Sequence, residues 1–155
     1  MAFVFQIQIK GITKTPVWRK LIVPSSYTFE QFHKAIQSAF GWNNTHLYEF
    51  RNKEHNFTLQ IGMPSKEDAF WGKEVEDARK VRLEEVFPAR SDKMVYIYNF
   101  GENWVHEIAL DETSAEEVSH ALCTESRGAC PSEDLGMAWR QDALKGGLWD
   151  DDFGF

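Results

Sequence analysis

Hydrophobic and polar positions alternate along several stretches of the chain, and a period of two predicts strands. Two such runs, 94–99 and 104–110, flank the short segment 101–103, which is typical of an antiparallel hairpin whose turn needs a left-handed residue. Alternation places His106 with the apolar set of its strand and Glu107 on the opposite face. We therefore interpret His106 as a hydrogen-bonded core histidine, with a role as ligand or proton carrier as the alternative.

The same period predicts further strands at 3–9, 17–23, 46–51 and 57–61, the first two forming a second hairpin. In the second of these strands Arg19 shares a face with apolar residues, where a guanidinium needs a carboxylate or carbonyl partner. We expect a structural ion pair there.

A period near 3.6 replaces the alternation at 29–40 and predicts the main helix. Thr28, followed three residues later by Gln31, is a capping-box signature, and Gly41 is a typical helix end. The apolar stripe of this helix must cover the sheet, with His33 at the edge of the stripe.

The remaining segments give weaker patterns. The charged stretch 65–80 is expected to be mostly loop with some local order, and 81–87 to be a short helix stopped by the proline that follows. Capping signals favour a helix over 114–122, and the sequence favours another at 137–144.

Length and composition are those of one globular domain spanning 1–155, since 43% of the 155 residues are hydrophobic and 14% are aromatic. The chain shows no export signal and no apolar run long enough for a membrane span, so we expect a cytoplasmic protein. Only two cysteines are present, Cys123 and Cys130, and both are expected to be reduced.

The net charge of −7 is unevenly distributed. Residues 101–155 hold 3 Lys/Arg against 13 Asp/Glu, so this last third carries −10. Such a field disfavours nucleic-acid binding, although a basic contact in the first half remains an alternative. Its candidate residues are Lys10, Lys14, Lys20 and Lys34.

Four strings occur in the order TPVWRK, FGW…HLYEF, YNFGENWVHEI and C…GACPSED, and in that order they resemble the plasmid pRiA4b ORF-3-like family. The resemblance covers roughly residues 3–136 and leaves an acidic C-terminal tail, 137–155. It implies an α+β roll-like fold, an association with plasmids and other mobile elements, and no established activity. The matched positions are Trp18, Arg19, Trp42, His46, Phe50, Tyr98, Phe100, Gly101, Trp104, His106, Cys130, Pro131, Glu133 and Asp134.

The chain departs from the family pattern at several positions. Asn99 and Glu102 stand where the family usually has Asp, Ser132 replaces its second Pro, and Leu135 stands where many members have another Cys. The family pattern also treats 118–123 as extended, which conflicts with the helix that the capping signals favour there. We prefer the extended alternative.

The cysteines and histidines allow two kinds of chemistry, metal binding and nucleophilic catalysis. His120, Cys123 and Cys130 are weak candidates for a zinc site, because they lack the two tight ligand pairs that structural zinc sites usually offer. Cys130 could act as a nucleophile with His46 or His106, but only if its thiol were exposed and its pKa lowered. The simpler interpretation makes Cys130 a packing residue.

Glu133 and Asp134 allow a similar choice between chemistry and structure. Adjacent carboxylates beside a histidine could serve as a general acid/base pair or bind a hard cation. The simpler interpretation has them cap the helix expected at 137–144 and hold the cysteine loop against Arg19 or the hairpin.

Together these patterns predict an α+β fold with a roll-like, mostly antiparallel sheet and one main helix packed across it. The function that we expect is that of a non-enzymatic binding or adaptor protein with an unknown protein partner, no cofactor and no bound metal. The competing hypotheses are a metal-assisted or Cys/His-dependent enzyme and a nucleic-acid-binding accessory protein. The expected contact surface comprises Arg19, His46, Trp104, His106, Glu133 and Asp134.

Overall fold

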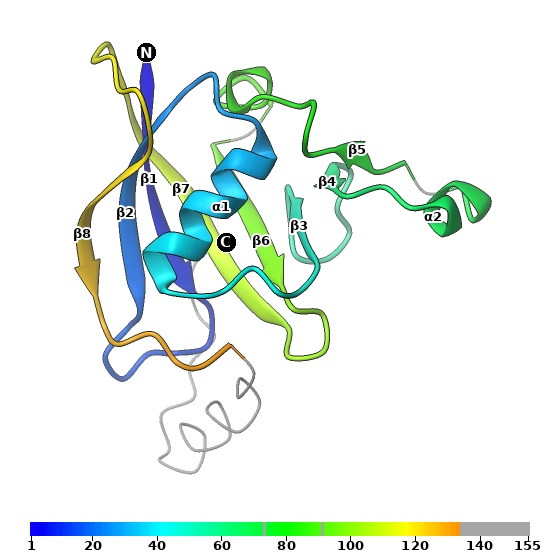
Figure 1. Ribbon diagram of the computed structural model, residues 1–155, viewed down its shortest axis with the longest axis horizontal. Helices are drawn as coiled ribbons and strands as arrows, with labels where there is room; N and C mark the ends of the chain where they lie inside the picture. The colour runs from blue at the N-terminus through cyan, green and yellow to red at the C-terminus, as the bar shows by residue number, and fades with distance from the viewer. Residues whose placement is uncertain (73, 91, 134–155) are drawn as a thin grey trace.

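An eight-stranded sheet with one long helix across its face forms the described part of the chain, residues 1–72, 74–90 and 92–133 of the computed structural model (Figure 1). The strand order is β5-β4-β3-β6-β7-β1-β2-β8, with antiparallel neighbours throughout except for the parallel pair β4 and β5. The α+β class and the mostly antiparallel sheet predicted from the sequence are confirmed. Along the chain the elements are β1 (Ala2–Ile9), β2 (Trp18–Pro24), α1 (Phe29–Phe40), β3 (Tyr48–Arg51), β4 (Gln60–Gly62), α2 (Lys66–Phe70), β5 (Glu76–Asp77), the 3-10 turn η1 (Leu83–Glu85), β6 (Lys93–Tyr98), β7 (Trp104–Ser114) and β8 (Leu122–Arg127).

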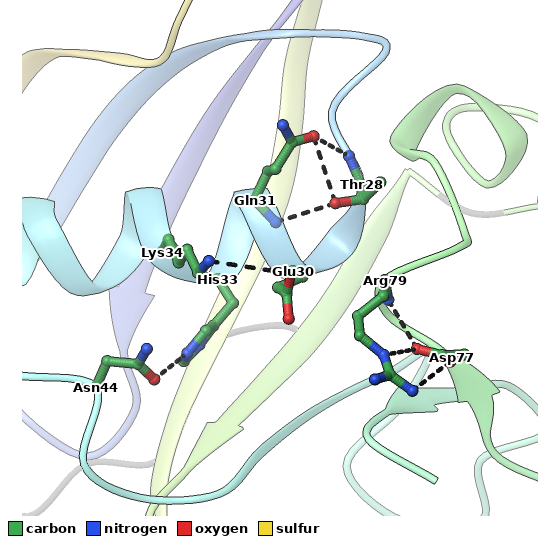
Figure 2. Close-up of polar contacts among 8 residues, drawn as sticks. All are labelled: Thr28, Glu30, Gln31, His33, Lys34, Asn44, Asp77 and Arg79. Atoms are coloured by element: carbon green, nitrogen blue, oxygen red, sulfur yellow. Dashed lines mark hydrogen bonds and ion pairs between the residues drawn. The ribbon is translucent and has the colours of Figure 1, made fainter.

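The main helix α1 begins and ends where its sequence signals predict. The Thr28 side chain accepts a hydrogen bond from the backbone N–H of Gln31 at 3.2 Å, and the Gln31 side chain accepts one from the Thr28 N–H at 2.8 Å (Figure 2). Gly41 ends the helix in the left-handed conformation, with φ of 72°. Phe29, Phe32 and Ile36 of the apolar stripe are fully buried against the sheet.

Alternation divides the sheet into an inner face, which α1 covers, and an outer face. Phe3, Phe5, Ile7 and Ile9 of β1 point inward, and their neighbours in the adjacent strands complete the main core. Its rings interlock, with the Phe5 centroid 4.9 Å from the centroids of both Phe32 and Phe87. The outer face carries a smaller buried cluster formed by Val95, Ile97 and Val105.

The central hairpin of β6 and β7 forms as predicted, and asparagines supply the left-handed residues of its turn. Asn99 and Asn103 adopt positive φ, 59° and 54°, on either side of the turn. Asparagine tolerates this conformation because its short side chain can bond locally, and the Asn99 Oδ1 accepts a hydrogen bond from the Glu102 N–H at 3.3 Å.

Several of the weaker predictions need correction. The helix expected over 81–87 is only the three-residue turn η1. The local order expected within the otherwise irregular stretch 65–80 is α2 and β5. No helix forms over 114–122, because β7 continues to Ser114 and β8 begins at Leu122, so the extended alternative is nearer the structure. The helix expected at 137–144 lies outside the described residues.

Two features lie at the periphery of the fold. The segment carrying α2 projects from the body of the protein beyond β4 and β5 (Figure 1). At the opposite end of the sheet order, β8 pairs with β2 along one edge only and all six of its residues are exposed. No helix among the described residues is long and apolar enough to span a bilayer.

Candidate functional site

The residues of the sequence motifs meet at one end of the sheet, where three segments far apart in the chain come together. These segments are the loop after α1, the β6–β7 turn and the stretch 130–133, all at the lower end of the sheet in Figure 1. They form a cluster around the buried Glu133 that we call the Glu133 clasp, consisting of Trp42, Asn43, Thr45, Tyr98, Asn99, Trp104, Pro131 and Glu133.

Glu133 is the centre of the clasp and bonds through both its side chain and its backbone. One carboxylate oxygen accepts from the Thr45 hydroxyl at 2.9 Å and the other from the Asn43 backbone N–H at 3.0 Å. Its backbone carbonyl accepts from the Trp104 indole N–H at 2.9 Å and from the Asn99 amide at 3.2 Å. Glu133 therefore anchors the end of the described chain to the loop after α1 and to the central hairpin.

Trp42, in the loop after α1, packs against the other aromatic residues of the clasp. Its indole N–H donates to the Pro131 carbonyl at 2.9 Å, and its ring stacks on Tyr98 at 5.4 Å and packs against Trp104 at 5.3 Å. Three aromatic motif residues thus hold the segment at Pro131 by ring contacts and directed hydrogen bonds. Within the described structure, the motif residues Trp42, Tyr98 and Trp104 therefore anchor the segment at Pro131.

His106 lies behind the clasp, fully buried, as its alternation pattern predicts. Its Nδ1 lies 3.1 Å from the Trp104 carbonyl and 3.2 Å from the Tyr96 carbonyl, so this nitrogen carries the proton. Nε2 has no hydrogen-bond partner among the described residues, and the ring packs edge-on against Phe40 and Trp42. Burial lowers the pKa of His106 to about 4, which keeps the imidazole neutral near pH 7.

A second buried network surrounds His33, which is not at the edge of the stripe as predicted but in the interior. Its Nε2 donates to the Asn44 side-chain oxygen at 2.6 Å (Figure 2), and its Nδ1 accepts from the Tyr96 hydroxyl at 2.6 Å. Gln37, one turn further along α1, donates to the same hydroxyl at 3.0 Å. Burial lowers the pKa of His33 to about 4, although the bond to Asn44 opposes the shift.

Sequence reasoning missed the His33 network, but a signal for it was present. His33 and Gln37 are spaced four residues apart on the helix, so their side chains lie one above the other next to the apolar stripe. Two polar side chains in that position need a shared buried partner, and Tyr96 provides it.

Arg19 is nearly buried, and within the described part of the chain no carboxylate pairs with it, so the expected ion pair is not found there. Its guanidinium donates to the backbone carbonyls of Ala39 at 3.0 Å, Trp18 at 2.8 Å and Arg127 at 2.9 Å, and lies over the Phe40 ring. Carbonyl oxygens disperse the charge without requiring a second buried ion. Arg19 thereby joins β2, the end of α1 and the end of β8.

The predicted contact surface is therefore mostly interior. The side chains of Arg19, Trp104, His106 and Glu133 are buried in this conformation. His46 is half-buried, with its ring edge-on to Tyr98 at 5.6 Å. Asp134, the last member of that surface, lies outside the described residues.

The geometry of the cysteines and histidines gives little support for the chemistry weighed from the sequence. Within the described ranges, no three His, Cys, Asp or Glu side chains gather closely enough to hold a metal ion, and His120, Cys123 and Cys130 form no such group. Burial raises the pKa of the Cys130 thiol to about 12, so it is not activated as a nucleophile. Cys130 packs against the core, in agreement with the simpler interpretation.

The fold and the clasp together define the structural class. It is an α+β protein in which motif residues distant in sequence surround a buried glutamate. The chain belongs to the plasmid pRiA4b ORF-3-like protein family, whose model matches residues 1–152. A curated relative, the uncharacterized protein y4hQ of Sinorhizobium fredii, is 36% identical over 125 residues, which are 79% of this chain. The chain spans 61% of that relative's length.

A solved structure shows a similar fold. It is that of a protein of unknown function, MM3350 from Methanosarcina mazei Go1, which is 30% identical to this chain. The TM-score is 0.77, and the match covers 95% of this chain and 81% of that one. These relatives carry no described activity in their names, so function has to be argued from this chain's own geometry.

Proposed function

We propose that the protein is a non-enzymatic binding or adaptor protein that holds a protein partner through a projecting aromatic arm. The arm is the segment 63–72, which contains α2. Phe70 and Trp71 stand at its end, 79% and 68% exposed, with their ring centroids 5.2 Å apart. This exposed aromatic pair is the observation that carries the proposal.

Leaving such rings in water costs free energy that a partner recovers by covering them. A large aromatic side chain buries about 150–250 Å² when it is covered, and each Å² of apolar surface contributes about 25 cal/mol. Two adjacent rings therefore offer a gross gain on the order of 8 kcal/mol to a partner with a matching apolar pocket, part of which offsets the entropy of association. Tryptophan is also among the residues most enriched at interface hot spots.

The location of the arm agrees with this role. It projects away from the clasp and from the main core (Figure 1), so a partner can cover it without disturbing the fold. The surface expected from the sequence cannot serve in the same way, because Trp104, His106 and Glu133 are interior. The arm takes its place in the proposal.

An association with plasmids and other mobile elements is part of the proposal and is supported by the name of the family alone. The nucleic-acid alternative is less favoured by the geometry. Lys10 pairs with Glu54 at 2.6 Å, and Lys20 lies 3.5 Å from Asp111 and 3.4 Å from a carboxylate of β8. These carboxylates weaken the positive field that a phosphate backbone would need.

Site-specific photocrosslinking tests the arm. Phe70 is replaced by p-benzoylphenylalanine in cells that carry the gene, with the same replacement at exposed Glu112 of β7 as the control. We expect a discrete adduct from position 70 only, and mass spectrometry then identifies the partner for purification.

The purified partner gives the decisive measurement. Trp71→Ala should weaken its binding about 30-fold, which corresponds to a hot-spot contribution of about 2 kcal/mol. Failure to obtain an adduct specific to position 70, or a purified partner that binds the Trp71→Ala variant as tightly as the original protein, would overturn the proposal.

A further inference from the structure

A groove between α1 and the first residues of β8 forms a second recessed surface, on a different part of the molecule from the aromatic arm. Its volume is about 540 Å³, within the range of ligand sites. Half-buried Ala35 and Ala39 and the buried Leu21 form its apolar floor, while Lys34 and His120 stand at its polar rim. Leu122 at the same rim is 48% exposed.

The groove continues past its own end, which makes it elongated. A second hollow of about 640 Å³ shares Tyr27 and Gln31 with the first and extends along Val118 and Ser119 to Arg82. The two hollows therefore follow the segment 118–123 on one side and α1 from Glu30 to Ala39 on the other. This shape suits an extended chain better than a compact small molecule.

The backbone beside the groove is available for pairing. Among the described residues, no hydrogen bond engages the backbone groups of Val118, Ser119 or His120, whereas the next residue, Ala121, donates its N–H to the Tyr27 hydroxyl at 2.9 Å. Ser119 and His120 lie in an exposed bend, and their N–H and C=O groups are open to main-chain hydrogen bonds from a bound peptide.

Charge decides which kind of chain fits. The protein as a whole carries −7, yet among the described residues no carboxylate lines the first hollow and Lys34 is its only charged residue. Arg82 adds a second cation in the continuation, against one carboxylate, that of Glu30. Lys34 is 63% exposed and is paired with Glu30 only at 4.0 Å (Figure 2), so its charge remains open to a ligand.

We propose that this groove binds an extended acidic peptide segment of a partner protein, with apolar side chains on the alanine floor and a carboxylate at Lys34. The inference deepens the adaptor proposal by adding a second contact, but it does not depend on the aromatic arm. A protein with both surfaces could hold two segments at once, which is what an adaptor requires.

A pair of labelled peptides tests the charge and the location together. The probes are fluorescein-labelled six-residue peptides that alternate valine with aspartate or valine with lysine, and binding is followed by fluorescence anisotropy at low salt. We expect the aspartate peptide to bind at least ten times more tightly than the lysine peptide. Its affinity should fall as salt is added, because the attraction to Lys34 is screened.

Three variants then locate the binding. Lys34→Glu should reduce affinity for the aspartate peptide at least tenfold, and Ser38→Trp should block the groove by bulk, since the exposed Ser38 lines it. Lys66→Glu makes the same charge change on α2 and should alter affinity less than twofold. Circular dichroism confirms that each variant is folded.

The outcomes separate this inference from the adaptor proposal. Trp71→Ala should leave peptide binding unchanged, so the arm and the groove can fail independently. No binding up to 1 mM peptide, equal binding of both peptides, or binding that survives both Lys34→Glu and Ser38→Trp would overturn the groove assignment.

Discussion

Replacing Glu107 by glutamine should stabilise the protein at pH 8 and have almost no effect at pH 4.5. Glu107 lies on the outer face of β7, only 3% exposed, and one of its carboxylate oxygens has no hydrogen-bond partner among the described residues. Burial raises its pKa from 4.5 to about 7; the nearby charges of Lys10 and Lys93 oppose this shift and that of Glu54 adds to it. The side chain therefore resists ionisation in the folded state.

The magnitude follows from linkage between proton binding and folding. Between pH 4.5 and 7 the unfolded chain loses this proton while the folded protein keeps it, so the free energy of unfolding falls as the pH rises and is constant above 7. One pKa unit corresponds to about 1.4 kcal/mol, which sets an upper limit of about 3 kcal/mol. Relaxation of the folded protein around the ionised carboxylate reduces this cost, so we expect about half of this limit.

Urea unfolding of the original protein and the Glu107→Gln variant at pH 4.5 and pH 8 measures this difference. Glu112→Gln, on the exposed end of the same strand, is the control and should change the free energy of unfolding by less than about 0.5 kcal/mol at either pH. The reasoning is refuted if Glu107→Gln brings no gain at pH 8, or if the gain is the same at both pH values.

Three further predictions concern Asn99 of the clasp, Gly128 after β8, and the two buried histidines. Asn99→Asp should destabilise the protein by about 2 kcal/mol at pH 7, because it turns the amide donor that bonds the Glu133 carbonyl into an acceptor; the loss should shrink as the introduced carboxyl is protonated, and urea unfolding at pH 7 and 3.5 compares the two. Gly128→Ala should lower the melting temperature by several degrees, since φ is 80° and an added Cβ would overlap the backbone of the β1–β2 connection, and differential scanning calorimetry measures the shift. Burial lowers the pKa of His33 and His106 to about 4, so as the pH falls from 6.5 to 4 the unfolded chain takes up protons that the folded protein does not, and the free energy of unfolding should fall by about 3 kcal/mol for each histidine. NMR titration should show both rings neutral at pH 6, and protonated rings at that pH would contradict the assignment.

Local patterns predicted the elements whose signals are short-range. Thr28 and Gln31 form the capping box that starts α1, because both partners lie within one helical turn. Alternation assigned His106 to the inner face for a similarly local reason, since successive side chains of a strand point to opposite faces. Both predictions needed no knowledge of distant segments.

Strand order and the polar networks depend on distant partners, and the sequence pattern does not identify them. Ser114 illustrates the difficulty, because its hydroxyl accepts from the Glu116 N–H at 3.1 Å in a turn instead of starting a helix. Likewise β1 lies between β2 and β7, and nothing in the alternation of β1 specifies the second neighbour. His33 is buried because the loop after α1 returns to it at Asn44, which its position on the helix does not reveal.

The buried position of the motif residues changes where differences in function within the family should be sought. Trp104 and Glu133 hold segments that are distant in sequence, so a substitution at either acts first on stability. Surfaces that select a partner must instead be exposed, as Trp71 and Lys34 are. Relatives that share the clasp can therefore share the fold while differing in what they bind, and the residues at the end of the arm and at the rim of the groove are the ones that would record the difference.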